Sequence, residues 1–114
     1  MALTASALHA LAQGSDGDAW RAIIEQAMEI AKKPLAAGNA PREVVKRDRE
    51  IGELDLFLST SGWDLWQVFS SSVERTSDRL LRWWAEPFSA KAVLILDGLS
   101  LRELPWLLQG AQLH

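Results

Sequence analysis

The stretch that decides the predicted fold runs from Ala92 to Gly98 and reads AVLILDG. Its five apolar residues follow one another without polar alternation, which is typical of a strand covered on both faces in the centre of a parallel sheet. The predicted strand ends in the carboxylate of Asp97, and Gly98 lets the chain turn sharply after it. The stretch therefore predicts a buried β-strand and, with the helices around it, an α/β fold.

Helical patterns precede this strand. Residues 2–12 are rich in Ala and Leu and end near Gly14, and Ser15 is a typical N-cap for a helix that Pro34 stops. Residues 42–58 predict a further helix, in which the charged stretch 42–50 is interpreted as a solvated face and residues 54–58 form an apolar end. An apolar stripe at helical spacing occupies residues 66–86. We expect a mainly helical region of three to four helices over residues 1–88.

A further helix is predicted after the strand. Ser100 and Glu103 match a capping box, S-x-x-E, at its start. Pro105 conflicts with a helix that begins at Leu101, because its ring would clash with the carbonyl of that residue. The conflict disappears if the helix starts later, with Pro105 in its first turn. Residues 89–114 would then be the start of an α/β domain.

A single strand cannot satisfy its own backbone groups, and residues 1–90 contain no second strand of equal quality. We therefore expect the front end of a larger α/β protein. Two alternatives stay open: a compact helical domain with one stray β segment, or a strand that a partner chain completes.

Composition narrows the functional class. The chain has 114 residues, a net charge of −3 and no cysteine, which excludes disulfides and thiol chemistry and argues against general nucleic-acid or anionic-membrane binding. No basic leader and no apolar run of membrane-spanning length is present, so we expect a soluble, cytoplasmic protein.

Asp97 is the strongest candidate for a functional residue. In open α/β sheets the ligand site lies beyond the carboxyl ends of the strands, where a carboxylate can bind a divalent cation. The helix that follows would direct free N–H groups toward the same place and favour a phosphate. The alternative is that Asp97 and Gly98 form an ordinary turn.

Residues 80–110 resemble the opening of a PglZ domain, a family of the alkaline-phosphatase superfamily. The resemblance is carried by WWAEP at 83–87 and by KAVLILDGLSLRELPW at 91–106. It implies that Asp97 is one ligand of a two-metal centre, with zinc as the usual metal. The nucleophile and the other ligands of that family lie further downstream, so Ser100 stays a helix cap.

The resemblance implies a metal-dependent phosphoester hydrolase for the parent protein, with phosphodiesters of nucleic acid as one candidate substrate. It also implies a bacterial setting in phage defence of the BREX type. These 114 residues would be inactive by themselves, because two-metal catalysis needs the complete ligand set. No catalytic or cofactor-binding residue other than the metal ligand Asp97 is predicted within the chain.

A second interpretation starts from the tryptophans. Trp63, Trp66, Trp83 and Trp84 lie close together in the sequence and could bind a partner, which predicts a non-catalytic helical protein–protein interaction domain. Large aromatics at helical spacing are more often core or interdomain packing. A third interpretation is a region that flanks the sheet of another α/β enzyme and regulates it.

Overall fold

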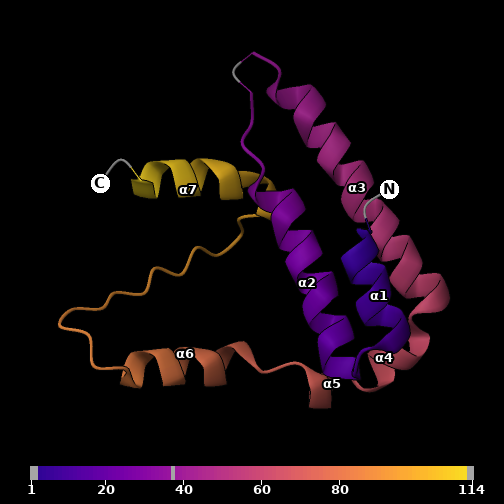
Figure 1. The fold of residues 1–114 in the computed structure, drawn as a ribbon. Coiled ribbons are helices and arrows are strands. Elements are labelled where there is room, and N and C mark those ends of the chain that lie inside the picture. Colours follow the sequence, from indigo (N-terminus) through magenta and orange to yellow (C-terminus); the bar gives the residue numbers. More distant parts are fainter. Residues whose placement is uncertain (1–2, 37, 113–114) are drawn as a thin grey trace.

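The computed structural model describes residues 3–36 and 38–112. Helices α1, α2 and α3 lie side by side, and after α6 a long extended connection carries the chain back to η1 and α7 (Figure 1). The elements are α1 (Ala5–Gln13), α2 (Asp16–Lys32), α3 (Ala40–Ser61), α4 (Trp63–Gln67), α5 (Phe69–Ser72), α6 (Thr76–Ala85), the 3₁₀ turn η1 (Leu101–Glu103) and α7 (Leu104–Gln112).

The start and end of α2 follow the local sequence. Ser15 is the N-cap: its hydroxyl accepts a hydrogen bond from the backbone N–H of Asp18, and the Asp18 carboxylate accepts one from the N–H of Ser15. This reciprocal capping box satisfies two N–H groups that the helix cannot pair internally. The helix ends at Lys32, before Pro34, as the sequence predicts.

Two apolar clusters hold the helices together. Ile30 of α2 and Leu54 of α3 are buried against each other, with Ala27 and Ile51 packed around them. At the other end of α2, Trp20 is only 3% exposed and makes edge-on ring contacts with Trp66 and Phe69, both at centroid distances of 4.8 Å. The core of the molecule therefore lies along α2.

The helix predicted over residues 66–86 is three helices. Trp66 and Phe69 dock against Trp20, which fixes α4 and α5 beside α2. The chain then becomes extended at Val73, directly after three serines, and α6 starts at Thr76. Serine side chains compete with helical backbone hydrogen bonds, so the serine run is a weak point of the pattern.

The predicted β-strand is absent, and the expectation of an α/β fold is wrong. None of the residues 3–36 and 38–112 lies in a β-strand, and residues 91–96 form an extended segment without secondary structure. Leu94 and Ile95 are 80% and 81% exposed. A strand buried on both faces needs neighbouring strands and covering helices, and the described chain places neither around this segment.

The C-terminal helix begins as one of the two sequence alternatives predicts. Ser100 and Glu103 form the capping box around the turn η1, and α7 starts only at Leu104. Pro105 therefore lies in the first turn of α7, where its missing N–H costs nothing. Helix α7 packs against α2, so the end of the described chain returns to the N-terminal helices.

The outline of the molecule is open. The Cα radius of gyration is 16.4 Å, compared with about 13 Å for a compact domain of this length. Helix α6 and the extended segment after it lie apart from the helices around α2 (Figure 1). Among the described helices, none combines the length and the apolar character that a membrane span requires.

Candidate functional site

Asp97 lies in an exposed turn. It precedes Gly98, whose φ of 79° is in the left-handed region that glycine adopts without strain. Within residues 3–36 and 38–112, no group of three or more His, Cys, Asp or Glu side chains is arranged to hold a metal ion. One carboxylate is too few for a stable zinc site, so the described residues do not fit a complete metal centre.

The capping groups after Asp97 are already paired. The Glu103 carboxylate accepts hydrogen bonds from the Ser100 N–H (2.9 Å) and the Ser100 hydroxyl (2.7 Å), and the hydroxyl accepts from the N–H of Arg102. These bonds to Ser100 lower the pKa of the Glu103 carboxyl. A phosphate at this turn would have to compete with an internal carboxylate.

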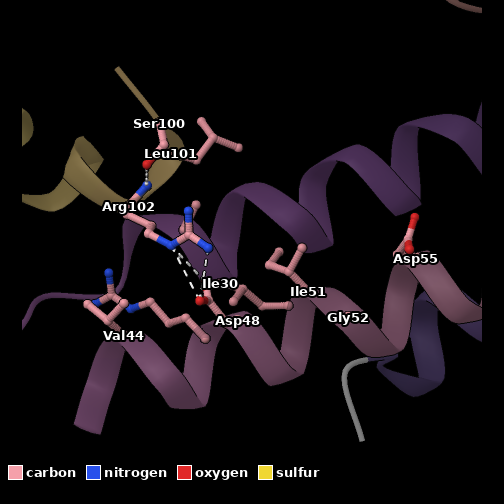
Figure 2. A pocket seen from close by; sticks show the side chains of 11 residues that line it. Ile30, Val44, Asp48, Ile51, Gly52, Asp55, Ser100, Leu101 and Arg102 are labelled. Atoms are coloured by element: carbon pink, nitrogen blue, oxygen red, sulfur yellow. Dashed lines mark hydrogen bonds and ion pairs between the residues drawn. The ribbon is translucent and has the colours of Figure 1, made fainter. Parts of the chain in front are cut away.

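A cavity of about 450 Å³ lies between α2, α3 and η1 (Figure 2). Most of its wall is apolar, and its polar groups come from α3 and from the segment that follows Asp97. The volume is in the range that small-molecule sites usually have. The lining side chains include Ile30, Val44, Ile51 and Leu101, with Arg47, Asp48 and Arg102 as the charged groups next to them.

An ion pair closes one side of this cavity. The Arg102 guanidinium of η1 donates from Nε to Asp48 Oδ1 (3.1 Å) and from Nη2 to Asp48 Oδ2 (3.0 Å), as the dashed lines in Figure 2 show. The contact raises the pKa of Arg102, chiefly through its hydrogen bonds to Asp48. Because these two residues are 54 positions apart, the pair joins the end of the described chain to α3.

Arg47 is the one buried charged residue of the described chain, at 7% exposure. Its Nη2 donates to the carbonyl of Lys33 at the end of α2. Its Nε and Nη1 are shielded from solvent and have no hydrogen-bond partner among the described residues. A charge of this kind is costly to bury, because desolvation is not offset by a counter-ion.

Sequence reasoning missed Arg47, although the pattern contains a signal. Val44, Arg47, Ile51 and Leu54 follow the i, i+3, i+7 spacing of the apolar stripe on α3, so the arginine occupies a core position. The interpretation of residues 42–50 as a solvated charged face overlooked that phase. The partner of Asp48 could not be read from local spacing, because it comes from the far end of the chain.

Four of the six tryptophans make ring contacts with one another, in two separate pairs. Trp66 packs on the buried Trp20 and on Phe69 but is itself 45% exposed, while Trp83 and Trp84 lie together on α6 with a ring separation of 6.0 Å. Lys91 fixes the end of α6: its ammonium donates to the carbonyls of Trp83 (2.8 Å), Trp84 (2.6 Å) and Glu86. A cation at a helix C-terminus also complements the helix dipole.

Comparison of the chain with known protein families, curated proteins and solved structures finds no match. The class of this protein is therefore defined by the geometry of its described residues alone. It is a helical protein with a small core along α2 and a projecting apolar segment.

Proposed function

We propose that this chain is a helical interaction module that binds a partner protein through its arm, defined as residues 76–99. The observation that carries the proposal is the exposure of large apolar side chains along the arm. They are Leu80, Leu81, Trp84, Phe88, Val93, Leu94, Ile95, Leu96 and Leu99.

The number and continuity of these side chains distinguish the arm from an ordinary surface. Single exposed hydrophobic residues are common, but a contiguous apolar patch usually marks an interaction site. Each large side chain gains about 1.5–3 kcal/mol when it is fully buried. Trp84, which is 54% exposed near the end of α6, is of the residue type most enriched among energetically dominant interface positions.

The extended part of the arm, residues 89–99, also has an unpaired backbone. No backbone–backbone hydrogen bond joins residues 89–99 to another described residue. Exposed N–H and C=O groups beside apolar side chains are the features by which an extended peptide is recognised in the groove of another protein. The arm therefore offers both a helical face and an extended peptide to one partner.

Site-specific photo-crosslinking in cells tests this proposal. A photoreactive amino acid at position 95 of the arm should give one discrete adduct with a second protein, and the adduct should disappear in the Leu94→Asp variant. The same amino acid at position 45, an exposed apolar position on α3, is the control and should give no such adduct. Equal adducts from both positions, or none from position 95, would exclude the arm as the docking surface.

We propose a second candidate function from the sequence resemblance: the N-terminal part of a PglZ-like, metal-dependent phosphoester hydrolase. The specific observation in its favour is the local geometry after Asp97, where Gly98 turns the chain and the Ser100–Glu103 box starts a helix. In this proposal Asp97 is one ligand of a metal, zinc by resemblance, and the other ligands lie outside the described residues. Phage defence in a bacterial cytoplasm would be its setting.

The coding sequence downstream of residue 114 tests this second candidate. A Ser or Thr nucleophile and further Asp and His ligands should follow, and the extended protein with zinc should hydrolyse bis-p-nitrophenyl phosphate. Asp97→Asn should abolish that hydrolysis without unfolding the protein, because the side chain is exposed in its turn. A stop codon directly after residue 114 would exclude this candidate and leave the interaction module.

A further inference from the structure

The cavity between α2, α3 and η1 is independent of the arm and of Asp97. Its walls are mostly apolar, with Ile30, Val44, Ile51 and Leu101 among the lining residues. Apolar walls with a small number of charged groups are the usual make-up of a site for a small organic molecule. Two further observations indicate the kind of molecule that would fit.

The first observation is the unsatisfied guanidinium of Arg47. This side chain lines the cavity, is 7% exposed, and keeps Nε and Nη1 without a hydrogen-bond partner among the described residues. No ion pair joins Arg47 to a carboxylate among the described residues, and Asp48, the next residue in the chain, is paired with Arg102. An arginine fork matches the two oxygens of a carboxylate or phosphate, so the missing partner is an oxyanion.

The second observation is the open wall at Gly52. This glycine lies inside α3 and lines the cavity, and a Cβ added there would meet no atom within 4 Å. Glycine inside a helix costs about 1 kcal/mol relative to alanine. No steric contact in the described structure requires glycine at this position, and a larger side chain there would occupy open space beside the cavity.

We propose that this cavity binds a small amphiphilic oxyanion, a molecule with one carboxylate or phosphate group on a short apolar body. The apolar body would lie against Ile30, Ile51 and Leu101, and the oxyanion would pair with Arg47. The cavity volume of about 450 Å³ limits the occupant to a small molecule.

Binding requires one movement of the protein. Nε and Nη1 of Arg47 are shielded while Nη2 donates to the Lys33 carbonyl. The guanidinium must therefore leave that carbonyl and turn toward the cavity that this side chain lines. Both side chains of the Arg102–Asp48 pair are exposed, and the pair stays in place during this movement.

Isothermal titration calorimetry with three probes of equal chain length tests the proposal: octanoate, octyl phosphate and uncharged 1-octanol. At least one of the two anions should bind the chain with one-to-one stoichiometry and about tenfold more tightly than 1-octanol. A tenfold difference in affinity is the contribution expected from one modest charge-assisted hydrogen bond, which the alcohol cannot make. The better anion of the two identifies the oxyanion that the site prefers.

Two variants and one control assign the binding to this cavity. Arg47→Gln should remove the preference for the anion, whereas Arg49→Gln, an exposed position on the same helix, should leave it unchanged. Gly52→Leu should abolish binding of all three probes while the helical circular dichroism and Tm are kept, since its side chain fills open space. This variant decides the matter if Arg47→Gln does not fold.

Three results would overturn the proposal. They are no binding of either anion to the wild-type chain, equal affinity for octanol and both anions, or unchanged binding in a folded Gly52→Leu variant. The last result would move the binding to the exposed arm, where amphiphiles can adsorb without using the cavity.

Discussion

Arg102 donates hydrogen bonds from two of its nitrogens to the carboxylate of Asp48, which lies 54 positions earlier in the sequence, and this contact joins η1 to α3. Helix α7 follows directly and packs on α2. The position of the C-terminal segment on the helical core therefore depends on one exposed ion pair and on the packing of α7.

Breaking this ion pair should loosen the C-terminal helix selectively. Both side chains are about half exposed, so salt screens the contact and its contribution to global stability is small. We expect Arg102→Gln to speed proteolysis and hydrogen exchange of residues 100–112 and to leave α2 and α3 protected. Arg82→Gln, which breaks a comparable exposed pair between Arg82 of α6 and Glu74 just before that helix, is the control. Unchanged exchange in Arg102→Gln would show that α7 packing alone holds the segment.

The capping box of α2 predicts a dependence of stability on pH. Hydrogen bonds from Ser15 lower the pKa of Asp18 below its usual value of 3.8. A carboxyl with a lower pKa in the folded state stabilises the fold above its unfolded pKa, and that contribution is lost as pH falls through the folded pKa. Ser15→Ala removes the hydroxyl donor, which is the larger cause of the lowered pKa, and keeps the backbone N–H donor. The Tm of this variant should therefore fall less steeply than that of the wild type below about pH 4. Parallel Tm curves would contradict this.

Trp20 should be the most sensitive position of the aromatic cluster. It is buried, contacts Trp66 and Phe69, and donates from Nε1 to the carbonyl of Leu65 at 2.9 Å. Trp20→Ala should lower the free energy of unfolding by about 3–5 kcal/mol, as expected for a large-to-small change in a core. Urea denaturation followed by circular dichroism measures it.

Trp63 is the matched control for this experiment. It is 67% exposed, and Trp63→Ala should change the free energy of unfolding by less than about 0.5 kcal/mol. If the two variants were equally destabilised, the core would not be centred on Trp20.

Two glycines should respond to alanine in opposite directions. Gly52→Ala should raise the free energy of unfolding by about 0.5–1 kcal/mol, because alanine favours the helix and its Cβ meets open space. Gly14→Ala should lower it, because the new Cβ would lie 2.6 Å from the Ala10 carbonyl oxygen at the end of α1. Urea denaturation of both variants tests these two predictions. A lower free energy of unfolding for Gly52→Ala would show that the space beside Gly52 is occupied.

Local signals predicted the helix boundaries well. Ser15 and Pro34 bracket α2, and Ser100 with Glu103 forms the capping box before α7, where Pro105 lies in the first turn. These features depend on residues within one helical turn of each other, so they can be read along the chain. The break between α5 and α6 was missed, because the apolar stripe in the sequence continues across it. The contact of Phe69 with Trp20 holds only the part of the chain before the break.

The apolar run Ala92–Leu96 shows where reading along the chain stops. By itself it predicted a buried strand, with an ordinary turn at Asp97 and Gly98 as the alternative to a metal ligand there, and the described structure has the turn but not the strand. Whether such a segment becomes a strand depends on partners elsewhere, since its backbone groups must pair with another strand. In the described chain that pairing is absent, and the run is an exposed part of the arm, residues 76–99. The burial of Arg47 and the contact between Asp48 and Arg102 were likewise decided only by tertiary structure, because they bring together groups from separate helices and distant positions.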